Sequence, residues 1–110
     1  MLQQYRSLRL KRFEAKVKAE KVASLETTMR DLETMADALS QQIAAEEQRT
    51  KIVDARRPDY SMVALNAASR RAKLLTSLTE FRSSLEAAKH EHAAAAAEVH
   101  NLELVRDVPS

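Results

Sequence analysis

Three histidines near the C-terminal end are the first side chains that could perform chemistry, as ligands of a metal ion. His90, His92 and His100 lie in the segment AAKHEHAAAAAEVHNLEL. Zinc ligands on one helix stand three or four residues apart, because that spacing turns both side chains toward one ion. His90 and His92 point to different faces, and His92 and His100 are about two turns apart. We therefore predict no metal site and assign His92 to a helix seam.

Adjacent carboxylates form the second candidate, as a pair for general acid–base work. Glu46 and Glu47 are neighbours in the chain, but such work requires a cleft that removes them from bulk water. The chain also contains no glycine, so it has no glycine-rich loop that could hold a phosphate. Since its periodicity predicts two helices without a cleft, we expect no enzyme, no catalytic residue and no cofactor.

Basic side chains near the N-terminus form the third candidate, a surface for an acidic partner. They are Arg6, Arg9, Lys11, Arg12, Lys16, Lys18 and Lys21. A basic helix followed by heptads is the layout of basic-zipper DNA-binding proteins. Here, however, a second helix returns along the first, and alanine and methionine replace regular leucines in the seam, which argues against nucleic acid. The apolar residues of this arm do not clearly form the pattern of a helix that lies on a membrane.

The composition restricts the elements that must position these groups. Of 110 residues, none is Gly, Cys or Trp and two are Pro. Without glycine the tight turns of β-hairpins are nearly excluded, whereas abundant Ala, Leu, Glu, Lys, Arg and Gln favour long helices. The absence of cysteine fits a reducing cytoplasm. No run of about 18 apolar residues could span a membrane, and the N-terminal segment lacks the apolar core of a secretory signal.

Apolar residues recur every three and four residues in two segments, as in the seam of a coiled coil. The first seam contains Val22, Leu25, Met29, Leu32, Ala36, Leu39 and Ile43. The second contains Ala64, Ala67, Arg71, Leu74, Leu78, Phe81, Leu85, Ala88, His92, Ala95, Val99 and Leu102. Leu10, Phe13 and Val17 keep the spacing but are out of phase with Val22, so we expect a stutter near residues 18–21.

The charge distribution favours an antiparallel arrangement of the two helices. The net charge by segment is +5 for residues 1–21, −5 for 22–48, +5 for 49–75 and −3 for 76–110. In an antiparallel hairpin, each basic block then lies beside an acidic block. We therefore predict an all-α fold, a single antiparallel two-helix coiled-coil hairpin over residues 1–110, with helices at about 3–53 and 61–106 and a bend at 54–60.

The proline in DARRPDYS is expected to make that bend. Pro58 lacks an amide donor and disfavours helical geometry at Arg57, so we expect it to stop the first helix. Asp59 or Ser61 can then accept a hydrogen bond from the first amides of the second helix as its N-cap. Arg56 lies at the exposed tip with Arg57, where both are candidates for a partner contact.

A charged residue interrupts the second seam. Arg71 occupies a seam position that a hydrophobic core does not explain. In an antiparallel hairpin Glu46 and Glu47 fall at the same level. We predict an ion pair between Arg71 and one of these carboxylates, with the arginine stem lying along the seam.

Three strings of this chain resemble the FliJ family of flagellar export proteins, in its alphaproteobacterial version. They are RLKRFEAKVKAEKVASLETTMRDLE at residues 9–33, QQIAAEEQRTKIVD at 41–54 and YSMVALNAASRRAKLLTSL at 60–78. The similarity extends from about Leu8 to Leu104. Its order is RLKRF, then IAAEE-x-RT, then a proline-containing bend, then YS followed by A-x-x-RR.

The resemblance implies a cytoplasmic accessory component of the flagellar type III protein export apparatus, and so a role in flagellum assembly and motility. Proteins of this family form an antiparallel two-helix coiled coil. They bind the ring of the export ATPase and the cytoplasmic part of the export gate, and they are linked to export chaperones. The implied location is the cytoplasmic face of the inner membrane, reached through the export apparatus without membrane insertion.

The charges select seven candidate partner-binding residues, which are Arg6, Arg9, Lys11, Arg12, Lys16, Arg56 and Arg57. Eight side chains are expected to form the main seam, namely Leu25, Leu32, Leu39, Ile43, Leu74, Leu78, Phe81 and Leu85. Two other hypotheses stay open. One is a homo-oligomeric structural coiled coil, starting from a homodimer, and the other is a helical protein whose basic arm binds nucleic acid.

Overall fold

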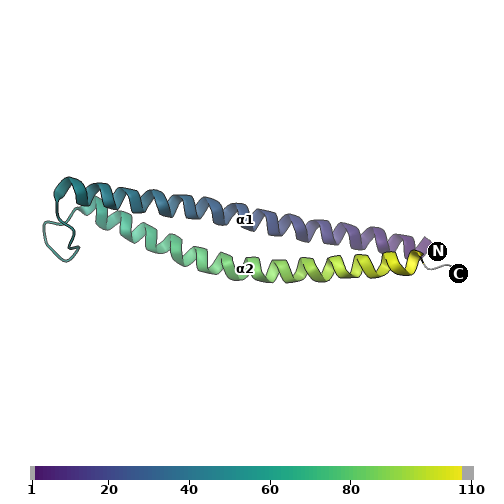
Figure 1. Ribbon diagram of the computed structural model, residues 1–110. Coiled ribbons are helices and arrows are strands. Elements are labelled where there is room, and N and C mark those ends of the chain that lie inside the picture. The colour runs from purple at the N-terminus through teal and green to yellow at the C-terminus, as the bar shows by residue number, and fades with distance from the viewer. Residues whose placement is uncertain (1, 108–110) are drawn as a thin grey trace. The chain divides into compact units, whose positions relative to one another are not determined.

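The protein consists of two long α-helices joined by a bend, as predicted. The computed structural model describes the backbone of residues 2–107 and the side chains of residue 3 and residues 5–105. Helix α1 covers Leu2–Thr50 and helix α2 covers Met62–Asp107 (Figure 1). Residues 2–107 contain no strand. The prediction of an all-α two-helix hairpin is therefore confirmed.

The chain divides into two compact units, each built from a stretch of both helices. We name Met1–Thr27 with Ser83–Ser110 the terminal unit, and Thr28–Arg82 the bend unit. In the terminal unit the start of α1 lies beside the end of α2, coloured purple and yellow in Figure 1. In the bend unit, hydrogen bonds join Ser40 to Arg71 and Glu46 to Ser61. Each unit therefore contains an antiparallel helix pair.

The core of each unit is a narrow seam of small and medium side chains. In the bend unit the buried seam residues are Met29, Ala36, Leu39, Ala64, Ala67 and Leu78. Leu32, Ile43, Leu74 and Phe81 are half-buried there. In the terminal unit Ala88 and Ala95 are buried, and Leu25, Leu85, His92 and Val99 are half-buried. Since alanine supplies many of these positions, the helices can approach closely, but each seam buries little apolar area.

The start of α1 departs from the expected stutter. Leu8 is 2% exposed, whereas Leu10, Phe13 and Val17 are 56%, 63% and 45% exposed. The positions that face α2 in this stretch are Leu8, Lys11, Ala15, Lys18 and Val22, each buried or half-buried. Their spacing of three and four residues continues the downstream seam in phase. The predicted stutter is therefore wrong: lysine stems and an alanine complete the seam, and the three large apolar residues face away from it.

Helix α1 ends at Thr50, about three residues earlier than predicted and well before Pro58. Lys51 adopts a left-handed backbone with φ of 62°, and its amide donates to the Glu47 carbonyl at 2.8 Å. This is the αL cap that a glycine normally makes. The hydroxyl of Thr50 donates to the Glu46 carbonyl at 3.0 Å and accepts from the Ile52 amide at 3.3 Å. Pro58 therefore does not stop α1, and the bend covers residues 51–61 instead of 54–60.

Ser61 begins the second helix. Its Oγ accepts a hydrogen bond from the Ala64 amide at 3.1 Å, and its carbonyl accepts from the Leu65 amide at 3.0 Å. These two bonds are those of an N-cap residue. Of the two predicted caps, Ser61 is therefore correct, and Asp59 instead binds Arg57.

Candidate interaction surfaces

Two ion pairs join the helices of the terminal unit. Lys11 Nζ lies 3.0 Å from Glu98 Oε2 and 3.3 Å from Glu14 Oε2, and Arg12 Nη2 lies 3.0 Å from Glu103 Oε1. The hydrogen bond to Glu98, supported by that to Glu14, raises the pKa of Lys11 above 10.5. The basic start of α1 thus lies beside the acidic end of α2, as the charge blocks predicted. Because water reaches these side chains and screens their charges, each cross-helix pair contributes little to stability.

The remaining cations of the predicted arm point into solvent. Arg6, Arg9 and Lys16 are exposed, and they form no ion pair with any side chain that the structure describes. The arm therefore divides into two groups. Lys11 and Arg12 form ion pairs across the two helices, while Arg6, Arg9 and Lys16 are available to a partner.

An apolar stripe runs along the same outward side of α1. We name Leu10, Phe13 and Val17 the outer stripe, since all three side chains are about half exposed or more. Sequence reasoning placed them in the seam because the three-and-four spacing fits any face of a helix. The usable signal was their phase, which differs from that of Val22. A continuous helix preserves phase, so out-of-phase apolar residues lie on another face.

The two arginines of the bend are each paired with a neighbouring aspartate. Arg56 Nε lies 3.1 Å from Asp54 Oδ1, and Arg57 Nη2 lies 2.8 Å from Asp59 Oδ2. The Arg56 side chain, with help from its amide, holds the pKa of Asp54 below 3.8. Both guanidinium groups remain exposed, but their charges are compensated locally. The stretch DARRPDYS is thus electrically balanced, in contrast to the exposed cations of the terminal unit.

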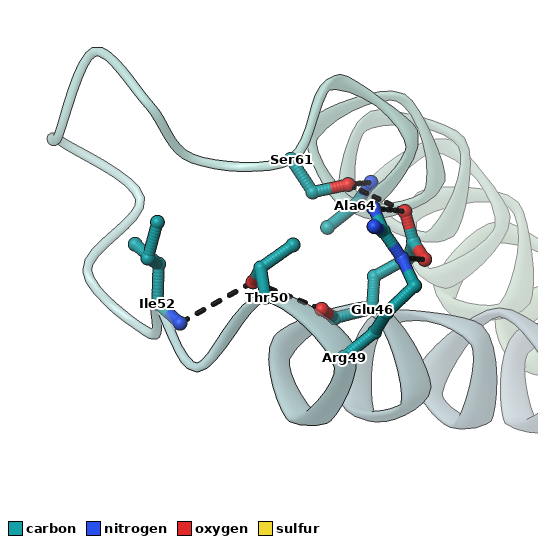
Figure 2. Close-up of polar contacts among 6 residues, drawn as sticks. All are labelled: Glu46, Arg49, Thr50, Ile52, Ser61 and Ala64. Atoms are coloured by element: carbon teal, nitrogen blue, oxygen red, sulfur yellow. Dashed lines mark hydrogen bonds and ion pairs between the residues drawn. The ribbon is translucent and has the colours of Figure 1, made fainter.

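Glu46 connects the end of α1 to the start of α2 (Figure 2). Its carboxylate accepts from Arg49 Nε at 2.8 Å and Nη2 at 3.1 Å, and from the Ser61 hydroxyl at 2.8 Å. The bonds from Arg49 and then Ser61 lower the pKa of Glu46 from its ordinary 4.5 to about 2. The Ser61 hydroxyl therefore donates to Glu46 while its oxygen caps α2 through Ala64.

Glu47 makes a second connection across the bend. The Tyr60 hydroxyl donates to Glu47 Oε2 at 2.7 Å, and Tyr60 is buried. This hydrogen bond is the main cause of a Tyr60 pKa above 10.0. Both members of the carboxylate pair are therefore engaged in holding the bend closed.

The predicted ion pair of Arg71 is wrong. Arg71 Nε donates instead to Ser40 Oγ at 2.7 Å across the helix pair. The expected acceptors already have other donors, since Arg49 and Ser61 bind Glu46 and Tyr60 binds Glu47. The Arg71 guanidinium binds the neutral hydroxyl of Ser40 on α1 in place of either carboxylate.

An open groove lies between the two helices of the bend unit. Its lining comes from α1 through Met35, Ala38, Leu39 and Gln42, and from α2 through Arg70, Lys73, Leu74 and Ser77. The floor is apolar and the titratable groups are two cations. Such a lining can accept an apolar side chain.

The histidines and carboxylates do not assemble a metal site in the part of the chain that the structure describes. Among the side chains of residue 3 and residues 5–105, no group of three or more such ligands converges. His90 Nε2 instead lies 3.5 Å from Glu86 on the same helix, and His92 is half-buried in the seam. Neither helix, over the described residues, has an apolar stretch long enough to cross a bilayer.

Comparison with known proteins adds no relative. No family model matches the chain, and no curated protein or solved structure matches it either. The resemblance to the FliJ family therefore rests on the strings quoted from the sequence, and the two-helix hairpin agrees with the fold that it implies.

Proposed function

We propose that this protein is a non-catalytic accessory component of the bacterial flagellar type III export apparatus, where it binds the export ATPase ring and the cytoplasmic part of the export gate. The proposal combines the sequence resemblance with a fold of the implied kind. It includes a peripheral position at the cytoplasmic face of the inner membrane, reached through the apparatus, and contact with export chaperones.

The observation that carries a binding role is the charge arrangement of the terminal unit. Lys11 and Arg12 form ion pairs with α2, so their charges are compensated within the surface that the two helices present. On that surface Arg6, Arg9 and Lys16 are exposed and lack a described carboxylate partner. Uncompensated cations on a fixed helix pair favour association with an acidic protein surface through faster encounter and orientation. A catalytic role gains no comparable support, because Glu46 and Glu47 are held by structural hydrogen bonds.

The experiment measures binding of the full chain to the purified export ATPase and, separately, to the cytoplasmic domain of the gate. The informative variant is Arg6→Glu with Arg9→Glu, which leaves the Lys11 and Arg12 ion pairs intact. A control variant, Arg82→Glu with Lys89→Glu, changes the charge equally at exposed positions on α2. We expect the first variant to weaken ATPase binding by about ten-fold or more and the control to bind normally.

The result that contradicts the proposed function is the absence of any binding between the unaltered protein and either partner. Equal binding by both variants would instead keep the function and remove the basic arm as its contact. The double substitution Arg56→Glu with Arg57→Glu checks the remaining predicted contact in the same assay. Because their charges are balanced by Asp54 and Asp59, we expect a smaller loss there.

A second candidate function is a homo-oligomeric structural coiled coil. The open apolar groove of the bend unit favours it, since a helix of a second copy could cover Met35 and Leu39. Molar mass from light scattering decides the matter. A dimer that the substitution Met35→Glu converts to a monomer would support this candidate, and a monomer at high concentration would exclude it.

A further inference from the structure

The outer stripe of α1 is an apolar surface that the helix pair leaves uncovered. Leu10, Phe13 and Val17 are spaced by three and four residues, so they line one face over about two turns, or roughly 10 Å. Leu8, two residues before Leu10, is buried against α2. This part of α1 therefore has two apolar faces on opposite sides, and the fold uses one of them.

Cations surround the outer stripe. Helical geometry places Arg9 and Lys16 along one border of the stripe and Lys21 along the other, with Arg6 one turn before Leu10. All four are exposed and make no ion pair with a described residue. Two carboxylates also lie beside the stripe: Glu20 is exposed, and the Glu14 side chain is 41% exposed and paired with Lys11. The uncovered face is therefore apolar along its centre, with four unpaired cations against two carboxylates around it.

We propose that this face of the terminal unit lies on an anionic lipid surface. Apolar side chains along the line of contact, with Lys and Arg at its borders, are the arrangement of helices that lie in a membrane interface. The exposure of Leu10, Phe13 and Val17 thus replaces the expectation from the sequence, in which this arm had no clear membrane-surface pattern. Phenylalanine enters the interfacial region, and the long basic side chains reach back to the lipid head groups. The attraction is peripheral and reversible, in keeping with a structure whose described helices do not span a bilayer.

The charges around the outer stripe favour an anionic lipid surface over a second copy of the chain. Two outer faces brought together would place Arg9, Lys16 and Lys21 of one copy near the same cations of the other. Like charges across a contact disfavour association. A bilayer containing anionic lipids is negative over its whole area, so it satisfies the cations at both borders at once.

A protein groove is the other surface that a convex apolar line could enter. Such grooves gain specificity from hydrogen bonds placed at particular positions. Of the cations around the outer stripe, Lys16 and Lys21 are compact charges on flexible stems, which provide attraction without a fixed bonding geometry. This composition favours a fluid anionic surface. The proposal does not depend on the proposed function, although an ATPase that bound the same cations would compete with lipid for them.

The test is co-sedimentation of the full chain with vesicles of phosphatidylcholine, either pure or mixed with phosphatidylglycerol. The stripe variant is Leu10→Ser, Phe13→Ser and Val17→Ser together. The matched control is Val53→Ser, Met62→Ser and Val63→Ser, which removes three exposed apolar side chains from the bend unit. We expect binding to the anionic vesicles alone, weakened about ten-fold or more by the stripe variant and by a rise in salt, but not by the control.

A second readout does not require the triple variant to fold. The chain contains no tryptophan, so Phe13→Trp introduces a single reporter on the outer stripe. Its emission should shift to shorter wavelength with anionic vesicles and should be quenched by brominated acyl chains. The matched reporter Leu75→Trp should show neither change.

Four results would overturn the proposal. They are no binding to anionic vesicles, equal binding to neutral vesicles, equal binding by the stripe variant, and an emission of the Phe13→Trp reporter that lipid leaves unchanged. Loss of ATPase binding by the stripe variant without any vesicle binding would assign the face to a protein groove. A dimer that the stripe variant dissociates would assign it to a second copy. Vesicle binding without ATPase binding would support this inference while contradicting the proposed function.

Discussion

The terminal unit and the bend unit hold the same two helices together by different means. Across the terminal unit the polar contacts are ion pairs between exposed side chains, Lys11 with Glu98 and Arg12 with Glu103. Across the bend unit they are hydrogen bonds of half-buried or buried groups, including Ser61 to Glu46 and Tyr60 to Glu47. Exposed ion pairs are screened by salt and contribute little. Buried hydrogen bonds cost more to lose, because the remaining partner is left unsatisfied.

The difference indicates which of the two units has side chains available to bind a partner. The bend unit is tied to its own residues, and its arginines are neutralised by neighbouring aspartates. The terminal unit keeps exposed cations and an exposed apolar stripe. Stability is therefore concentrated where the chain turns, and capacity for contact is concentrated where the chain begins.

The largest expected effect tests which face of α1 belongs to the core of the terminal unit. Leu8→Ala removes a side chain that is 2% exposed, so we expect a loss of about 2–5 kcal/mol in the free energy of unfolding. Leu10→Ala removes the same atoms from an exposed position and should cost less than about 1 kcal/mol. Chemical denaturation followed by circular dichroism measures both. Equal losses would show that the two faces are not distinguished.

The next effect tests the cap of the bend unit. Ser61→Ala removes the oxygen that caps α2 and the donor to Glu46, so we expect a loss of about 1–2 kcal/mol. Ser69→Ala, at an exposed position inside α2, should be neutral or slightly stabilising, since alanine has the higher helix propensity. Thermal unfolding of the two variants provides the measurement, and an unaffected Ser61→Ala protein would contradict the assignment.

The pH dependence of the bend unit is the third prediction. The pKa of Glu46 is lowered from 4.5 to about 2, so the ionised carboxylate is favoured in the folded state. Its stabilising contribution is complete above pH 4.5 and is lost as the pH falls toward 2. Glu46→Gln should therefore be less stable than the unaltered protein at neutral pH, and the two should converge over this acid range. Glu80→Gln, an exposed change on α2, provides the control in the same acid titration.

The smallest effect concerns the ion pairs of the terminal unit. A double-mutant cycle on Lys11 and Glu98 should give a small coupling at low salt, weaker than the loss caused by Ser61→Ala. The coupling should disappear at about 1 M salt, where the screening length is near 3 Å. The Tyr60–Glu47 pair should keep its coupling in the same salt, because Tyr60 is buried. Salt-resistant coupling of Lys11 would remove the proposed contrast between the units.

Periodicity predicted most of the fold, because a heptad determines which residues face a partner helix. It failed at Leu10, Phe13 and Val17, where a valid spacing occurs on the wrong face and a continuous helix keeps its original phase. It also failed at the end of α1. The residue in the left-handed cap there is Lys51, whereas such a cap is usually identified in a sequence by a glycine. The partner of Arg71 could not be predicted without knowing that Ser61 and Tyr60 occupy Glu46 and Glu47.

The sequence predicted a basic surface near the start of α1, but it did not predict which residues form that surface. Charge alone selected Arg6, Arg9 and Lys16 together with Lys11, although Lys11 is used within the helix pair. Charge also selected Arg56, whose neighbouring aspartate compensates it. Net charge in a sequence window does not reveal which cations already have a carboxylate across the fold. The apolar half of the surface required knowing that α1 runs without a break through residues 18–21, which the structure shows.

The buried phenol of Tyr60 has one more consequence, at alkaline pH. Its hydrogen bond to Glu47 raises the pKa of Tyr60 above 10.0, which means that the folded state favours the neutral phenol. Its stabilising contribution is complete below pH 10 and is lost as the pH rises through the raised pKa. Ionisation would set a phenolate against a carboxylate, so base should loosen the same bend that acid loosens through Glu46. The turn of this hairpin thus has an upper and a lower pH limit, each marked by a different residue.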